Sequence, residues 1–364
     1  MALRARFRGF CRKMRIVFAT PGGIEARTGG QGYCRRVMEA LPSFNIDVAH
    51  VALRGRFPFP SVDEAMEAAR AINAAARPRD IALIDSAAFG AMDEEAIRPI
   101  KAPVVALCHR PLWLEPRLGV AEAAALLARE KAALAMAAHV IVTSRQSRIA
   151  LTESMGAPAS SIAVAPPGAD PAQRAQGSER GTALLAVGAI IPRKGFDILV
   201  EALAGLRDIH WRLRLVGAAA CSPETAAVLA RQIEARGLGA RIDWLGELDA
   251  QQLDRIYDAS DIFVSPSLCG GCGMGLAEAL SRGLPVIATI GRAGAGALPV
   301  DAGLNIPPGD VGAIRDALKR VMLDSALRGK LADGAWRAAG DLPTWTDTAR
   351  IISRVARAVA PVAA

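Results

Sequence analysis

Short apolar runs alternate with longer alanine-rich segments twice along the chain, and this alternation constrains the fold more than any other feature. Each run has four to nine residues and is mostly apolar on both faces, which is typical of parallel strands buried between helices. The runs are residues 15–20, 45–53, 81–86, 104–109, 139–144 and 162–165 in the first half and 183–188, 212–217, 241–246, 262–267, 285–289 and 303–306 in the second.

Amphipathic segments separate these runs; residues 62–77, 120–138, 196–205 and 223–236 are examples. Strand–helix alternation of this kind predicts an α/β fold with doubly wound, Rossmann-like sheets. The stretch 166–180 contains three prolines, two glycines and few apolar residues, which is typical of a linker. Two α/β domains joined in this way form a cleft, and ligands of such sheets bind beyond the carboxyl ends of the strands.

The domain organisation follows from the same pattern. We expect a first domain over 14–170, a linker over 171–180, a second domain over 181–342, and a last segment over 343–364. That last segment holds an amphipathic stretch, 345–359, whose apolar stripe needs a surface to cover. We therefore expect it to form a helix that packs back on the first domain.

The net charge of the 364 residues is +8, and five basic residues without any acid stand within residues 1–13. Such a segment either grips an anionic surface or precedes a true start at Met14. No apolar run reaches the roughly 18 residues that span a bilayer, and no interleaved aromatic–basic stripe suggests nucleic-acid binding. We expect a cytoplasmic protein, with peripheral contact at the inner face of the plasma membrane left open.

The six cysteines do not form the framework of a small disulfide-rich domain. Cys269 and Cys272 make one isolated CxxC, whereas a structural zinc site needs four ligands. We therefore predict no metal. The sequence also lacks Asp-x-Asp, which argues against a diphosphate bridged by a metal, and it lacks the dinucleotide fingerprint G-x-G-x-x-G.

Four motifs follow predicted strands. Thr28-Gly-Gly-Gln-Gly-Tyr33 precedes a helix, and glycines there let the backbone approach an anion at the helix N-terminus. His109 and Arg110 end another strand, where α/β sites are built. The Arg193 guanidinium can bind a diphosphate through two N–H groups, and the Lys194 ammonium can add a compact positive charge. Gly270, Gly271, Gly273 and Gly275 open a helix that carries Glu278, a carboxylate suited to a vicinal diol.

From about Met14 to its end, the chain resembles retaining glycosyltransferases of family 4, which have the GT-B architecture. The motifs that carry this resemblance keep their order and spacing along the chain. They are Thr28-Gly-Gly, Leu107-Cys-His109, residues 140–144 and 162–170, Val187-Gly, residues 192–197, Ser265-Pro-Ser, and residues 273–279, 283–289 and 302–310.

The resemblance implies a nucleotide-sugar donor, transfer with retention and no required metal. It implies that Lys194 and Arg193 bind the diphosphate with Gly273, Met274, Gly275 and Gly30, that Glu278 holds the ribose, and that His109 orients the sugar. Gly217 and Leu248 would lie near the nucleobase, and Gly29, Tyr33 and Arg110 on the side of a carbohydrate or lipid-linked acceptor. Lys194 and His109 would be the catalytic residues.

Two positions depart from the family pattern. The family usually has a glutamate where this chain has Gly270, and an arginine where it has Ala189. Both losses remove a charge expected near the donor. Two alternatives therefore stay open: a non-catalytic partner subunit that binds nucleotide sugars, and a nucleotide-sugar epimerase or phosphorylase of the same architecture.

Overall fold

The computed structural model describes residues 13–25, 28–116, 118–269, 273–289 and 298–361. Most of the basic segment 1–13 lies outside the described residues, as do Gly270, Gly271 and Cys272. Expectations that rest on those positions are therefore not tested here.

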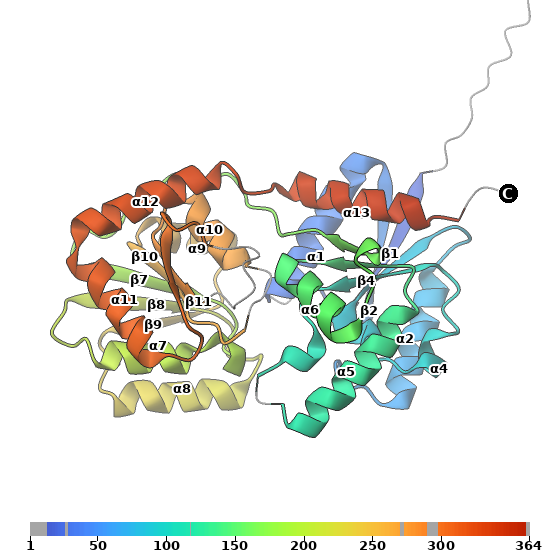
Figure 1. Cartoon of the computed structure of the whole chain (residues 1–364), viewed down its shortest axis with the longest axis horizontal. Coiled ribbons are helices and arrows are strands. Elements are labelled where there is room, and N and C mark those ends of the chain that lie inside the picture. Colours follow the sequence, from blue (N-terminus) through green and yellow to red (C-terminus); the bar gives the residue numbers. More distant parts are fainter. Residues whose placement is uncertain (1–12, 26–27, 117, 270–272, 290–297, 362–364) are drawn as a thin grey trace, which may run out of the picture.

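Two parallel sheets, each of six strands, form the framework (Figure 1). The first has the order β2-β1-β3-β4-β5-β6 and the second β12-β11-β10-β7-β8-β9. A strand forms at each of the twelve predicted runs, with ends that differ by at most two residues. The strands are β1 (Met14–Pro21), β2 (Ile46–Leu53), β3 (Ile81–Asp85), β4 (Val104–Cys108), β5 (His139–Val142), β6 (Ile162–Val164), β7 (Thr182–Val187), β8 (Trp211–Val216), β9 (Ile242–Gly246), β10 (Ile262–Ser265), β11 (Val286–Thr289) and β12 (Gly303–Ile306).

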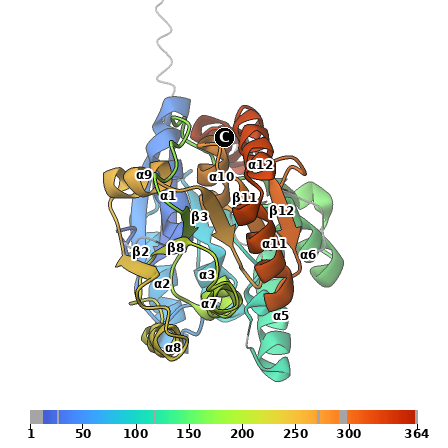
Figure 2. The same ribbon diagram turned by 90° about the vertical axis from the view of Figure 1, so that its left-hand side faces the viewer.

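Helices cover both faces of each sheet (Figure 2). Those of the first domain are α1 (Gly29–Ala40), α2 (Val62–Ala75), α3 (Ser86–Phe89), α4 (Glu94–Ile97), α5 (Val120–Ala135) and α6 (Arg145–Met155). Those that follow are α7 (Phe196–Ala204), α8 (Pro223–Ala235), α9 (Ala250–Asp258), α10 (Met274–Ser281), α11 (Val311–Leu323), α12 (Ser325–Ala339) and α13 (Trp345–Val359). Short 3₁₀ turns span Leu41–Phe44, Leu112–Leu114, Ala159–Ser161 and Pro192–Lys194.

Strand β1 shows why its sequence is apolar throughout. Val17 and Ala19 pack in a cluster with α2 and α5, whereas Ile16 and Phe18 pack in the opposite cluster with α1 and α13. Alternate side chains of a strand point to opposite faces, so a strand covered on both sides has no polar face. The predicted α/β class with two doubly wound sheets is confirmed.

The last helix returns to the first domain, as predicted (Figure 1). Trp345 of α13 is buried, and its ring lies 5.7 Å from that of Tyr33 in α1. The Thr348 hydroxyl donates to the Pro166 carbonyl at 2.6 Å. Gly168 admits this crossing, since a Cβ there would lie 2.2 Å from the Trp345 nitrogen. The domain limits given above stay a prediction.

Among the described residues, no helix combines the length and the apolar character needed to cross a bilayer.

Candidate active site

His109 and Asp85 mark the carboxyl end of the first sheet. Asp85 is the last residue of β3, and His109 follows the neighbouring strand β4. The side chains are close, with His109 Nε2 3.7 Å from Asp85 Oδ2, and they are 16% and 11% exposed. The carboxyl end of this sheet, where ligands of α/β sheets bind, therefore carries an imidazole and a carboxylate side by side.

Three neighbours position His109. Tyr33 presents its ring edge-on at 5.1 Å, and the Thr143 hydroxyl donates to the His109 carbonyl at 3.1 Å. Gly30 lies against the imidazole, because a Cβ there would be 3.4 Å from Cδ2. Burial lowers the pKa of His109, and the charge of Asp85 opposes this only in part. The imidazole is therefore neutral near pH 7.

The acceptor-side residues are placed unevenly. Gly29 is exposed in the first turn of α1, which begins there because Thr28 caps the helix by accepting the Gln31 N–H at 3.3 Å. Tyr33 is fully buried and donates to the Ala165 carbonyl at 2.8 Å. Its ring lies against His109, and its role toward an acceptor stays a prediction.

Arg110 follows His109 and reaches the second domain. Its guanidinium pairs with Glu115, and its Nη1 lies 3.8 Å from Cys269 Sγ. The residue is therefore a bridge between the domains in addition to any contact with an acceptor.

In the second domain, Arg193 and Lys194 occupy the turn Pro192–Lys194 after β7. Gly195 ends this turn with φ +64°, and a Cβ there would lie 2.2 Å from the Pro266 carbonyl oxygen. Only glycine fits that conformation and that approach. The Lys194 side chain crosses Gly188, where a Cβ would lie 2.7 Å from Lys194 Cε. The turn thus keeps a cation beside Ala189, where the family arginine is missing.

Helix α10 begins beyond β10 as predicted. Gly273 precedes it with φ +72°, and Met274 and Gly275 form its first turn. The first N–H groups of a helix have no partner within it and attract anions. A Cβ on Gly275 would lie 3.2 Å from Phe263 Cζ, so the glycine also lets the helix sit low on the sheet.

Glu278 lies one turn further along α10 and is held by Tyr257. The Tyr257 hydroxyl donates to Glu278 Oε2 at 2.9 Å, and Arg282 stacks over the Tyr257 ring at 4.6 Å. Burial raises the pKa of Glu278, against the hydrogen bond from Tyr257 and the charge of Arg282. The same burial raises the pKa of Tyr257 well above its usual value, so the phenol stays a donor.

The segments that follow the carboxyl ends of the strands in the two sheets meet between the domains. A Cβ on Gly32 of α1 would lie 3.1 Å from Met274 Cε, and Met274 packs against the core of the first domain. Around Cys269, burial raises the pKa of the thiol, and the nearby charges that oppose it are Arg110, Arg193 and Lys194. The structure therefore brings the basic residues of both domains to one place.

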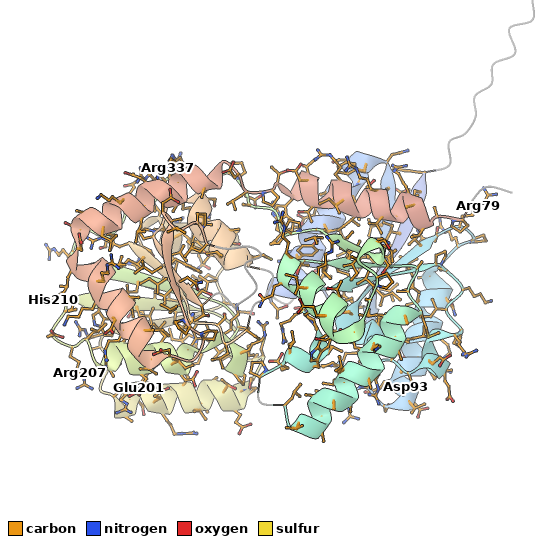
Figure 3. The ribbon with its side chains drawn as sticks, viewed as in Figure 1. Arg79, Asp93, Glu201, Arg207, His210 and Arg337 are labelled. Atoms are coloured by element: carbon orange, nitrogen blue, oxygen red, sulfur yellow. The ribbon has the colours of Figure 1, made fainter. Side chains whose placement is uncertain are left out.

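A cavity of about 180 Å³ lies at this junction. Residues of both domains line it, among them Arg110, Ser144, Ser147, Cys269 and Thr289. A second depression of about 460 Å³ runs along α11, but only that helix and Asp324 beside it line it, far from the strand ends. The exposed His210 also lies at the outer end of the second domain (Figure 3).

The two positions expected near the nucleobase are Gly217 and Leu248. Gly217 follows β8, and a Cβ there would lie 1.8 Å from the Gly188 carbonyl oxygen. Leu248 is half-buried and packs against a core cluster of the second domain. Their role toward a base stays a prediction.

The sequence analysis missed four neighbours of the predicted site residues: Asp85 and Cys34 beside His109, Tyr257 beside Glu278, and Glu130 near Arg110. The position of Asp85 could have indicated it, because Asp85 lies at the end of a predicted strand, and this strand pairs with the strand that precedes His109. Tyr257 had a weaker signal, since the chain has only two tyrosines. Cys34 and Glu130 lie inside helices, and nothing in their local sequence marks them.

Two family profiles match consecutive parts of the chain. Residues 15–173 match "Glycosyltransferase Family 4", and residues 170–337 match "Glycosyl transferases group 1". The chain belongs to glycosyltransferase family 4. The curated relatives agree: the D-inositol 3-phosphate glycosyltransferase of Corynebacterium aurimucosum is 30% identical over 222 residues. That match covers 54% of this chain and 51% of the relative, so the chain spans about half the length of the curated relatives it matches.

Solved structures place this family 4 chain in the GT-B fold. Sucrose-phosphate synthase from Thermosynechococcus elongatus superposes with a TM-score of 0.79 at 22% identity, covering 95% of this chain and 98% of that one. Anabaena Alr3699/HepE in complex with UDP-glucose gives a TM-score of 0.71 at 19% identity, covering 94% and 100%. At these identities the likeness shows the fold, and the expected GT-B architecture is confirmed.

Proposed function

We propose that this family 4 chain transfers a sugar from a nucleotide-sugar donor to an acceptor hydroxyl, with retention of anomeric configuration and without a required metal. The observation that carries the proposal is that residues at the carboxyl ends of the two sheets meet between the domains. His109 and Gly30 come from one domain, and Arg193, Lys194 and the first turn of α10 come from the other. This is the separation of roles that a donor lying across the junction needs.

The second domain would hold the donor. Lys194 and Arg193 supply positive charge to the diphosphate, and the N–H groups of Met274 and Gly275 add the positive end of a helix dipole. The Glu278 carboxylate would accept hydrogen bonds from the ribose hydroxyls, with Tyr257 fixing its orientation. Anabaena Alr3699/HepE, of the same fold, was solved with UDP-glucose, which supports this class of donor.

The transfer itself would proceed on one face of the sugar. The bond from the anomeric carbon to the diphosphate breaks, the acceptor oxygen bonds to that carbon on the same face, and a diphosphate oxygen takes the acceptor proton. The protein contributes position and charge: His109 orients the sugar from the first domain, and Lys194 stabilises the leaving diphosphate. Such a route does not require a carboxylate base.

The acceptor is proposed only as a class, a carbohydrate or lipid-linked hydroxyl on the side of Arg110. The curated relatives act on D-inositol 3-phosphate, as their name states, so a phosphorylated polyol is the first acceptor to try. Because Arg110 lines the cavity between the domains, an anionic acceptor would meet a guanidinium there.

Thermal shift with UDP, GDP, ADP and TDP, each with and without magnesium, tests the donor site. A ligand at 100-fold excess over its dissociation constant stabilises by about 2.7 kcal/mol. We expect one nucleotide to raise the melting temperature equally with and without magnesium, and its sugar esters to support transfer. Absence of a shift with all four would overturn the donor site, and a shift without transfer would favour the non-catalytic binder.

A further inference from the structure

Three side chains of the first domain converge on one point beside the proposed site. The Cys34 sulfur lies 3.4 Å from His109 Nε2, and Asp85 Oδ2 lies 3.7 Å from the same nitrogen. The three ligand-type atoms all lie within 4.8 Å of one another. Cys34 is fully buried in α1, so this contact is built into the core.

The arrangement is not that of a nucleophile, a base and an orienting acid. In such a relay the acid contacts one imidazole nitrogen and the nucleophile contacts the other. Here both groups address Nε2, and the buried Nδ1 has no hydrogen-bond partner. Of these two groups, Nε2 lies within hydrogen-bond distance of the Cys34 sulfur only, because 3.7 Å to Asp85 Oδ2 is too long for a hydrogen bond. A cation between the three atoms satisfies all of them.

The spacing fits a tetrahedral ion. Zinc bonds of about 2.3 Å to sulfur and 2.0–2.2 Å to nitrogen and oxygen place neighbouring ligands roughly 3.4–3.6 Å apart. Taken pair by pair, the sulfur–nitrogen distance of 3.4 Å is about 0.2 Å shorter than the tetrahedral value, and the oxygen–nitrogen distance of 3.7 Å is about 0.3 Å longer. A thiolate, an imidazole and a carboxylate are also a ligand set that zinc accepts and that magnesium or calcium does not favour.

The surroundings hold these ligands in place. Asp85 Oδ1 accepts the Ala87 N–H at 2.9 Å, which turns Oδ2 toward the histidine. The Tyr33 ring lies edge-on to the imidazole, with 5.1 Å between the ring centroids, and holds its plane from the side. Gly30 flanks His109 Nε2 without a side chain, since a Cβ there would lie 3.7 Å from that nitrogen.

We propose that Cys34, Asp85 and His109 bind one divalent ion of the zinc class, beside Gly30. The site does not depend on the proposed function, but its consequence does. An ion on Nε2 withdraws that nitrogen from the donor sugar, so zinc would inhibit transfer and a chelator would restore it. The ion is therefore a regulator of the site and not a cofactor of the reaction.

Cobalt(II) absorption tests the site without any activity assay. The experiment uses the full chain with the substitutions Cys269→Ser and Cys272→Ser, so that the CxxC does not contribute to cobalt binding. One equivalent of Co²⁺ is expected to give a sulfur-to-cobalt charge-transfer band and tetrahedral d–d bands, and Zn²⁺ is expected to displace both. Cys34→Ser removes the charge-transfer band, while Asp85→Asn keeps it and weakens cobalt binding by more than the roughly 10–100-fold that the loss of an outer-shell partner costs.

Cys108→Ser is the matched control. Cys108 is also fully buried and precedes His109, but it packs in the cluster on the other face of the sheet. It is expected to leave the cobalt spectrum unchanged. Circular dichroism and melting temperature show whether each variant folds. If Cys34→Ser does not fold, the weaker cobalt binding of Asp85→Asn still tests the site. No band in the starting protein, or a band that survives Cys34→Ser or disappears with Cys108→Ser, would overturn the site.

Discussion

The two domains treat their buried polar groups differently. Among the described residues, two buried side-chain atoms lack a hydrogen-bond partner, His109 Nδ1 and Glu130 Oε1, and both belong to the first domain. In the second domain the corresponding site carboxylate, Glu278, is paired with Tyr257. Buried polar groups are nearly always paired, so the contrast shows where the protein keeps unused hydrogen-bonding capacity.

The two tyrosines of the chain show the same contrast. Each is fully buried behind a proposed site residue, Tyr33 behind His109 and Tyr257 behind Glu278. Tyr33 contacts His109 through its ring edge and donates its hydroxyl hydrogen bond to the Ala165 carbonyl, whereas Tyr257 donates its hydroxyl hydrogen bond to the Glu278 carboxylate. The two tyrosines therefore act differently: Tyr33 contacts its site residue through the ring, and Tyr257 contacts its site residue through a hydrogen bond.

Lys194→Ala tests the second domain most strongly. The change removes the cation proposed to stabilise the leaving diphosphate, so transfer is expected to fall about 10²–10³-fold. Affinity for the nucleoside diphosphate, measured by calorimetry, falls with it. Lys319→Ala, an exposed lysine on α11 of the same domain, is the control and leaves both quantities unchanged. Full activity of Lys194→Ala would remove the lysine from the site.

His109→Ala is expected to distinguish the contribution of the first domain to the reaction from that of the second domain to nucleotide binding. The rate of transfer falls about 10²-fold because the sugar loses its partner, while the affinity for the nucleoside diphosphate alone is unchanged. The comparison is between kcat and the dissociation constant by calorimetry, and His210→Ala at the outer end of the molecule is the control. Equal losses in rate and nucleotide affinity would erase the contrast between the domains.

Replacing each tyrosine by phenylalanine sharpens the contrast. Tyr257→Phe removes a hydrogen bond that favours the Glu278 carboxylate, so the pKa of Glu278 rises further and nucleotide affinity falls about tenfold. The pH below which binding weakens should also move upward, since the protonated acid accepts fewer hydrogen bonds. Tyr33→Phe is the matched variant: it leaves the Ala165 carbonyl unpaired and costs about 1–3 kcal/mol of stability without changing nucleotide affinity. Identical behaviour of the two variants would contradict the distinction.

Glu130 provides the smallest test. Burial raises its pKa to about 8, opposed by the Leu112 N–H, which donates to Oε2 at 2.7 Å, and by the charge of Arg110. Because the folded pKa exceeds the unfolded value of about 4.5, the folded state binds the proton more tightly, and stability falls as pH rises from about 4.5 to about 8. Glu130→Gln does not titrate, so from about pH 6.5 to 8 it should gain about 1–2 kcal/mol over the unaltered protein.

Unfolding in urea at several pH values measures this gain. Glu94→Gln, an exposed acid of the first domain with its own ion pair, is the control and should show no comparable trend. A stability difference between Glu130→Gln and the unaltered protein that is independent of pH would contradict the buried, protonated carboxyl.

The sequence was sufficient for the elements and for most of the proposed site. Runs apolar on both faces located all twelve strands, because only a strand covered by helices on both sides lacks a polar face. Turn chemistry located the Arg193–Gly195 turn and the start of α10, because glycines with positive φ stand there. The start of α1 was placed too late, since Thr28 caps the helix before the glycines and draws them into its first turn.

What the sequence could not supply are the contacts between segments distant along the chain. Cys34, Asp85 and His109 meet because α1 and the ends of β3 and β4 share one edge of the sheet, and Tyr257 meets Glu278 because α9 lies beside α10. Local sequence determines periodicity, caps and turns, since these depend on neighbours a few residues away. Burial, pairing and the pKa values that follow from them depend on which segments the packed fold brings together, and only the tertiary structure decided those.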